Sequence, residues 1–325
     1  MKAIIYTKYG SPNVLKLKEI EKPLPKANEI LIKNYATSPT SGDVKMRSFK
    51  DIPFLPWLPM RFFLGLTKPK RQILGFSVAG VVDVVGEDVK LFKVGDKVFG
   101  STGFNGGSYA EYICLPENGV VIKKSSKMTY EEAAAIPFGA LTALHFLKKG
   151  NIKKGSQVLI YGASGSLGTY AVQLAKNFGA TVTGVCSGKN IKLVKSLGAD
   201  KVVDYTKGNV FKKNQLYNVI FDTVGKSNFT KSVQSLKLNG IYLRAIHLRL
   251  ASIIKGIWTQ LTSNKKVIGG VASESTENLF FLKELFDQGK LKPVINKRFD
   301  LKEMAKAHKY IETGHKIGNV VVKIK

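Results

Sequence analysis

The segment YGASGSLGTYAVQLAKNFGA, residues 161–180, limits the possible folds of this chain more than any other stretch. An apolar run, QVLIYG, leads into glycines spaced by three, and the residues that follow have the spacing of an amphipathic helix. Small residues at such a turn let the backbone approach a pyrophosphate, whose charge binds the first N–H groups of the helix. Strand, turn and helix in this order predict a dinucleotide site; the alternative is a tight turn without a ligand. The predicted cofactor contacts in the turn are Gly162, Ser164, Gly165, Ser166, Leu167 and Gly168.

The sequence after about residue 128 repeats the alternation of strand and helix. Thr129 stands at a plausible N-cap before two glutamates, so MTYEEAAAIPFGALTALHFLKKG predicts a helix. Further strands are predicted in the runs TVTGVC, KVVDY, NVIFDTVG, GIYLRAI and VIGGVAS. Short apolar strands separated by helices indicate βαβ units in a parallel, doubly wound sheet.

The first 122 residues have a different pattern. Runs such as AIIYT, EILIKNYAT and VAGVVDVVG are rich in β-branched residues and are separated by turns with Gly and Pro. They predict an antiparallel, barrel-like β domain, and the last run, NVVVKIK, is a strand that could pair with it. We therefore expect an α/β protein with a β domain of residues 1–122, completed by residues 293–325, and a cofactor domain of residues 123–292.

The composition argues against several classes of protein. The chain has two cysteines, Cys114 and Cys186, and no CxxC pair, which disfavours zinc ribbons, iron–sulfur clusters and a disulfide framework. The start lacks the apolar core of a signal peptide and no long apolar run spans a membrane, so we expect a cytoplasmic protein. The net charge of +28 fits a polyanion partner such as nucleic acid, but the dispersal of the basic residues favours a solvated basic surface.

The end of the strand after the glycine turn indicates which dinucleotide binds. In NAD sites an acid about 20 residues beyond the turn binds the ribose 2′-OH. Here the segment reads CSGKN, so Ser187 takes the place of the acid, with Lys189 and Asn190 beside it. Tyr205, at the end of the next strand, is expected over the same pocket. A hydroxyl and an ammonium bind a 2′-phosphate that a carboxylate would repel, so the sequence favours NADPH, with an ordinary exposed lysine as the alternative for Lys189.

The order of these parts is similar to that of a known superfamily. GASGSLGTYAVQLAK, LGADKVVDY and the C-terminal GHKIGNVVV, behind a β domain, resemble the medium-chain dehydrogenase/reductases along essentially the whole chain. The resemblance is closest to the zinc-free branch of quinone oxidoreductases and alkenal (enone) reductases. It implies a GroES-like β-barrel catalytic domain, a Rossmann domain that binds NADP(H), and a homodimer. It also implies cofactor contacts from the backbone around Val271 to Ser273, which would bind the carboxamide, and from Asn319.

This chain lacks the residues that bind the catalytic zinc in the alcohol dehydrogenases of this superfamily. Thr40 and Ser41 stand in the region of the first ligand, a cysteine, while Phe76 and Ser77 take the places of a histidine and a glutamate. Zinc needs three protein ligands beside its open position, so we expect no metal. The four histidines of the chain are scattered and fit surface or packed positions better than a metal site: His145, His247, His308 and His315.

Without a Lewis acid, reduction of an isolated carbonyl leaves an alkoxide that nothing stabilises, whereas an enone or a quinone delocalises the added charge. Hydrogen-bond donors and a proton source then suffice. The resemblance implies that Lys45 donates the proton, that Asp43 orients Lys45, and that Thr142 approaches the nicotinamide. A surface salt bridge is the alternative for the first pair, and a helix residue that bonds its own backbone is the alternative for Thr142.

Residues 49–66, FKDIPFLPWLPMRFFLGL, are rich in proline and aromatic residues. They fit a pocket wall for hydrophobic enones, a loop packed across the cleft, or a membrane-surface contact. Two functions besides the reductase stay open: an NADPH-binding protein that binds polyanions without catalysis, and an NADP-dependent alcohol dehydrogenase without metal. The physiological substrate is beyond the reach of the sequence.

Overall fold

The computed structural model describes residues 1–49, 62, 64–212, 215–245 and 250–325. The chain divides into two compact units. Unit 1 consists of Met1–Phe138, Glu274–Asp287 and Ile295–Lys325, and unit 2 of Gly139–Ser273 and Gln288–Val294. The predicted domains, residues 1–122 with 293–325 and residues 123–292, stay a prediction.

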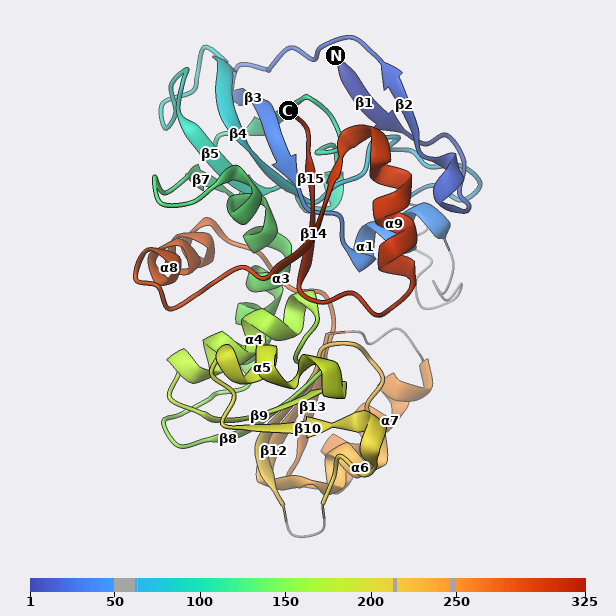
Figure 1. Ribbon diagram of the computed structural model, residues 1–325, viewed down its shortest axis with the longest axis vertical. Coiled ribbons are helices and arrows are strands. Elements are labelled where there is room, and N and C mark those ends of the chain that lie inside the picture. Colours follow the sequence, from blue (N-terminus) through green and yellow to red (C-terminus); the bar gives the residue numbers. More distant parts are fainter. Residues whose placement is uncertain (50–61, 63, 213–214, 246–249) are drawn as a thin grey trace. The chain divides into compact units, whose positions relative to one another are not determined.

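Unit 1 contains most of its strands in one sheet (Figure 1). The strands are β1 (Lys2–Ile5), β2 (Lys16–Glu19), β3 (Glu29–Thr37), β4 (Ser77–Val85), β5 (Lys97–Ser101), β6 (Tyr112–Pro116), β7 (Val121–Lys123), β14 (Ile295–Asp300) and β15 (Asn319–Lys323). The seven-stranded sheet has the order β14-β15-β3-β4-β5-β7, with β6 also paired to β3, while β1 and β2 form a separate pair. Within the large sheet only β14 and β15 run parallel, and the other paired strands are antiparallel.

The alternating apolar residues of these strands form the core of unit 1. Ile30 and Ile32 of β3 pack against Val78 and Val82 of β4, and all four are essentially inaccessible to solvent. Side chains two apart in a strand point to the same face, so this spacing buries one face of the sheet. The predicted pairing of the C-terminal strand with the β domain is confirmed, because β15 lies antiparallel to β3.

Unit 1 includes the helices α1 (Ser41–Ser48), α8 (Thr276–Asp287) and α9 (Met304–Glu312). The sequence analysis did not predict α1, which begins at a reciprocal cap. Thr40 Oγ1 accepts the N–H groups of Gly42 and Asp43 at 3.1 and 3.2 Å, while the Asp43 carboxylate accepts the Thr40 N–H at 2.8 Å. A threonine followed three residues later by an acid is the signal for such a cap.

The helix α3 (Tyr130–Lys149) crosses from unit 1 into unit 2 within the chain. Its predicted N-cap is confirmed: Thr129 Oγ1 accepts the Glu132 N–H at 3.1 Å, and Glu132 accepts the Thr129 N–H at 2.9 Å. Buried alanines and leucines line the inner face of this helix, so it is held by packing despite Pro137 in its interior.

Unit 2 is the predicted doubly wound parallel sheet (Figure 1). Its strands are β8 (Gln157–Tyr161), β9 (Thr181–Cys186), β10 (Lys201–Asp204), β11 (Tyr217–Asp222), β12 (Leu236–Arg244) and β13 (Lys266–Gly269), and its further helices are α4 (Ser166–Asn177), α5 (Ile191–Ser196), α6 (Phe229–Gln234) and α7 (Leu250–Thr262). All strand pairs are parallel, in the order β10-β9-β8-β11-β12-β13. The order in which strands are added to the sheet therefore reverses between β8 and β11, and ligands of such sheets bind at that switch point.

Candidate active site

The glycine turn lies at the carboxyl end of β8, beside the switch point of the sheet. Gly162 has a φ of +83° and donates its N–H to Val185 of β9 at 3.0 Å. Gly168, in the first turn of α4, lies so close to the strand that a Cβ there would come within 2.1 Å of the Gly162 carbonyl oxygen. Gly165 is the N-cap of α4 and supplies no side-chain acceptor to its first N–H groups. The turn thus forms the close approach of strand and helix that a pyrophosphate site requires.

Three predicted cofactor residues lie together beside this turn. Asn190 Nδ2 donates to Ser164 Oγ at 3.0 Å and to Ser187 Oγ at 3.2 Å. Lys189, next to this cluster, is exposed, and Tyr205 at the end of the neighbouring strand is 43% exposed. The edge of the turn is therefore polar, with the ammonium group of Lys189 next to Asn190 along the chain, while Ser166 and Leu167 belong to the first turn of α4.

An acid that the sequence analysis left out also lies at this edge. Asp204 ends β10 directly opposite Cys186 of β9, and a Cβ on Gly188 would come within 2.5 Å of its carboxylate. Its carboxylate accepts the N–H and O–H of Thr206 at 2.9 and 2.7 Å, and these bonds lower the pKa of Asp204. Asp204 is thus engaged with its own loop and with the backbone of Gly188, and the pairing register of β9 with β10 is the signal that places it.

A second acid, Asp222, lies at the switch point and, unlike Asp204, is buried. Asp222 ends β11 and is fully buried, and its carboxylate accepts the N–H groups of Val224, Gly225 and Ser227 at 2.8–3.1 Å. Thr223 Oγ1 donates to the carbonyl of Tyr161 at 2.8 Å, which fastens this loop to the end of β8. The sequence analysis assigned no role to Asp222, although an acid at the carboxyl end of a central strand is a typical loop anchor.

On α3, Thr142 precedes His145 by one turn, so both lie on one face of the helix. His145 Nδ1 receives the backbone N–H of Ser273 at 3.2 Å and lies 2.9 Å from its hydroxyl. Burial lowers the pKa of His145, which favours the neutral ring that accepts the N–H. This contact joins α3 to residues 271–273 after β13, where Val271 is half exposed. His145 thus holds the loop that the sequence analysis named for the carboxamide.

In unit 1, α1 carries two of the predicted catalytic residues, Asp43 and Lys45. Asp43 is fully buried, and its carboxylate accepts the N–H of Gly75 at 2.9 Å as well as the Thr40 bonds of the cap. These hydrogen bonds give Asp43 a role in holding α1 in place, and an orienting role toward Lys45 stays a prediction. Lys45 is partly buried near the middle of the helix. Asn319 is the buried first residue of β15, and its contact with a cofactor also stays a prediction.

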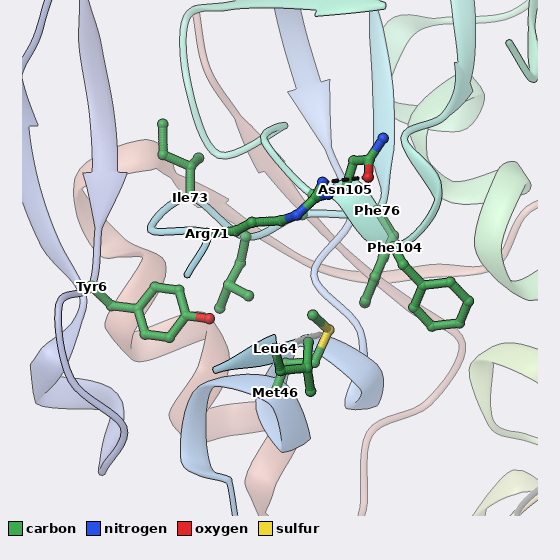
Figure 2. Close-up of a pocket in the computed structure, with 11 residues that line it drawn as sticks. Tyr6, Met46, Leu64, Arg71, Ile73, Phe76, Phe104 and Asn105 are labelled. Atoms are coloured by element: carbon green, nitrogen blue, oxygen red, sulfur yellow. Dashed lines mark hydrogen bonds between the residues drawn. The ribbon is translucent and has the colours of Figure 1, made fainter. Parts of the chain in front are cut away.

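A small pocket in unit 1 lies beside α1 (Figure 2). Its lining is Tyr6, Met46, Leu64, Arg71, Ile73, Leu74, Gly75, Phe76, Phe104, Asn105 and Gly106. Figure 2 shows the Arg71 side chain reaching toward Asn105, to whose amide oxygen it donates. Aliphatic and aromatic side chains form the rest of the wall, so the pocket suits an apolar group with one polar end. Of the segment 49–66, for which a pocket wall, a packed loop or a membrane-surface contact was predicted, residues 50–61 and 63 lie outside the described residues.

The positions where the alcohol dehydrogenases have zinc ligands are filled by packing. Phe76 stacks on Phe138 with ring centroids 5.2 Å apart, and the backbone carbonyl of Ser77 accepts the hydroxyl of Thr37 at 2.8 Å. Among the described residues no group of three or more His, Cys, Asp or Glu side chains could hold a metal. His308 is buried and His315 is exposed, while His247 lies outside the described residues. In the part of the chain that the structure describes, no helix is long and apolar enough to span a membrane.

Two buried titratable groups near α1 have opposite effects on stability. Burial raises the pKa of Asp43 to about 6, against the hydrogen bonds from Thr40, Gly75 and Tyr109. Burial, with the charge of Arg47, lowers the pKa of His308 to about 3, and the ring lies 3.0 Å from the Tyr109 hydroxyl. A raised carboxyl pKa gives stability that is present at low pH and lost as the pH rises through 6. The lowered histidine pKa gives stability that is present above 6.5 and lost as the pH falls toward 3.

We therefore expect the two contributions to offset each other between pH 7 and pH 5. In the variant His308→Phe, which keeps a ring against Tyr109, the Asp43 contribution remains alone. Its free energy of unfolding should increase by about 1 kcal/mol from pH 7 to pH 5, and this change should exceed that of the parent protein by about 2 kcal/mol, because the loss from His308 is removed. Urea unfolding at the two pH values measures this difference. The variant His315→Phe, at an exposed position, should behave like the parent, and equal pH dependence in all three proteins would contradict the assignment.

Two family profiles match the chain. One, described as the alcohol dehydrogenase GroES-like domain, matches residues 26–125, and the other, described as zinc-binding dehydrogenase, matches residues 197–322. With the β domain and the doubly wound sheet, these matches make the chain a member of the medium-chain dehydrogenase/reductase superfamily. Within it, the relatives at 30% identity or more place the chain in the zinc-free branch of quinone oxidoreductases and alkenal/enone reductases.

These relatives match nearly the whole chain. A 2-methylene-furan-3-one reductase from Solanum lycopersicum is 34% identical over 99% of this chain and 79% of its own length. A chloroplastic NADPH-dependent alkenal/one oxidoreductase from Arabidopsis thaliana is 32% identical over the same shares. Among solved structures, a quinone oxidoreductase from Coxiella burnetii is 31% identical and superposes with a TM-score of 0.89 over 100% of this chain and 99% of that one. The resemblance drawn from the sequence is therefore confirmed.

Proposed function

We propose that the protein is a zinc-independent, NADPH-dependent oxidoreductase that reduces α,β-unsaturated ketones and aldehydes or quinones. The observation that carries the proposal is the polar cluster of Ser164, Ser187 and Asn190 beside the glycine turn, with Lys189 adjacent. The names of its relatives, alkenal/one oxidoreductase and quinone oxidoreductase, support the same reaction class.

The residues of the turn fit a dinucleotide. Gly165 leaves room before α4, since a Cβ there would meet only the Gly162 carbonyl oxygen at 3.4 Å, so the backbone is open toward a pyrophosphate. Ser187, Lys189 and Tyr205 would hold the 2′-phosphate, and the loop at Val271 to Ser273 would hold the carboxamide. When bound, NADPH supplies the hydride, and the chain supplies position and polarity.

The residues of unit 1 indicate which class of substrate accepts the hydride. An enone that accepts a hydride becomes an enolate, whose charge is delocalised and needs only donors and a proton. In our proposal Lys45 of α1 supplies that proton, and the wall of Phe76 and Phe104 excludes water from an apolar acceptor. Since Phe76 and Ser77 replace metal ligands, an isolated ketone would lack a partner for its alkoxide.

The test is oxidation of NADPH and NADH with an alkenal, a quinone and a saturated ketone, with EDTA present throughout. Turnover of the alkenal or the quinone with NADPH, without turnover of the ketone, supports the proposal. Tight NADPH binding without turnover of any acceptor would support a binding protein, and ketone reduction that EDTA abolishes would mean that a metal site exists after all. A homodimer in the cytoplasm stays a prediction, and sedimentation velocity measures the oligomeric state.

The preference for NADPH should depend on Lys189. We expect Lys189→Ala to raise the KM for NADPH by about tenfold or more, because a charge-assisted bond to the 2′-phosphate is lost. The KM for NADH should not change. Lys195→Ala removes another exposed lysine, on α5, and serves as the matched control. Equal KM values for NADPH in all three proteins would show that Lys189 is an ordinary surface lysine.

A further inference from the structure

The helix α7 exposes an apolar face that the proposed reaction does not use. Ile254, Ile257, Trp258 and Leu261 are 58%, 54%, 67% and 77% exposed. Their spacing of i, i+3, i+4 and i+7 places them on one side of the helix. They present roughly 500 Å² of apolar surface, which is as large as the largest exposed apolar patch of a typical monomeric protein, and such patches often bind a partner or a membrane.

The opposite face of α7 fixes the helix to the sheet. Gly256 and Thr259 are buried, and a Cβ on Gly256 would come within 3.3 Å of Val267 in the edge strand β13. The side chain of Lys265, just beyond the helix, donates to the carbonyl of Val233 at 2.7 Å. Because the buried face of α7 packs on β13, the exposed apolar side chains lie on the face opposite the sheet of unit 2.

The charge around this face is strongly positive. Unit 2 contains 22 Lys and Arg residues against three Asp and no Glu, so its formal charge is +19 of the +28 of the whole chain. Residues 250–270 contain three lysines and no carboxylate, and Lys255 and Lys266 are exposed beside the apolar side chains. Apolar side chains with a tryptophan, flanked by lysines, are what a helix lying in an anionic membrane surface presents.

We infer that α7 is the docking surface of unit 2 for an anionic lipid bilayer. Thirteen residues are too short to cross a bilayer, so the helix lies in the headgroup region with Trp258 and its apolar neighbours inserted. A second copy of the chain fits less well. The patch is smaller than the roughly 800 Å² that each partner of a stable dimer buries, and residues 250–270 offer no carboxylate to pair with the lysines of a copy. Nucleic acid would use the lysines but leave the apolar face unexplained.

The experiment is co-sedimentation of the full chain with vesicles of phosphatidylcholine, with and without phosphatidylglycerol. We expect binding to the anionic vesicles only, weakened by salt. The double variant Ile257→Ser/Trp258→Ser should reduce binding at least about tenfold, and Lys255→Glu should reduce it by a smaller factor. Leu238→Ser, at a 74% exposed apolar position of β12, is the matched control and should bind like the parent. Unchanged melting temperatures verify that the variants are folded.

A second readout follows Trp258 itself. In a Trp57→Phe background, Trp258 is the remaining tryptophan, and its emission should shift to shorter wavelength when anionic vesicles are added. Three results would overturn the inference: vesicle binding that the double variant leaves unchanged, binding to a DNA duplex but not to vesicles, or a loss of oligomers in the double variant without any vesicle binding. Reductase activity toward water-soluble acceptors is measured separately, so failure here leaves the proposed reaction untouched.

Discussion

Replacing Gly168 by alanine should destabilise unit 2 by about 3 kcal/mol or more, which is the upper range for inserting atoms into a packed site. The added Cβ would come within 2.1 Å of the Gly162 carbonyl oxygen and 2.8 Å of the Ala163 Cα. Both atoms belong to the backbone of the turn, so no side-chain rotation relieves the clash. The helix α4 must move away from β8, and the phosphate turn is lost with it. Thermal unfolding and NADPH titration measure the two effects.

Gly165→Ala is the matched control, three residues earlier in the same turn. Its φ of −78° suits alanine, and the nearest atom, the Gly162 carbonyl oxygen, is 3.4 Å away. We expect a loss of less than about 1 kcal/mol in stability, the ordinary effect of alanine at an N-cap. NADPH affinity should nevertheless fall, because the methyl group occupies the space toward the pyrophosphate. If Gly168→Ala is as stable as Gly165→Ala, the close approach of α4 to the turn is wrong.

The sequence predicted the parts of the fold that depend on local pattern. The glycine turn, the Thr129 cap and the return of the last strand to β3 each follow from a short motif or from alternating apolar residues. The helix α1 was missed, although its cap has a signature in Thr40 and Asp43, because an aspartate replaces the more usual glutamate. The helix α7 was missed for another reason. Its large apolar side chains are exposed and its buried face carries Gly256 and Thr259, so its pattern does not match a helix that buries its apolar face.

The site shows the same division. Ser187 and Asn190 were found because they follow a predicted strand at a known distance from the turn, and the structure brings both together with Ser164. The bond from Ser273 to His145 joins residues 128 positions apart, and no local pattern encodes such a pairing. Likewise, the position of Asp222 beside the glycine turn can be predicted only once β11 is known to pair with β8. The site residues that the sequence did not reveal are those whose contacts depend on the pairing of distant segments, which local propensity does not determine.

Replacing Lys45 by methionine should lower kcat for an alkenal by about 100- to 1000-fold, the usual contribution of a positioned proton donor. Methionine keeps an unbranched apolar chain on α1 and removes the ammonium group. NADPH affinity should not change, because Lys45 is not among the predicted cofactor contacts. Steady-state rates and a direct NADPH titration separate the two quantities. Lys149→Met, at an exposed position of α3, is the control for the loss of a lysine.

The size of the effect should depend on the acceptor, and this dependence distinguishes a proton donor from a structural residue. An enolate is strongly basic, so an alkenal needs a donor at the moment charge develops. A quinone becomes an aromatic hydroquinone anion that is stable without one. We therefore expect Lys45→Met to slow quinone reduction by less than about tenfold. If Lys45 only fastened α1, both acceptors would lose rate by the same factor, because a displaced helix would misplace either one. Equal losses would therefore remove Lys45 from the proposed reaction and leave the binding of NADPH as described.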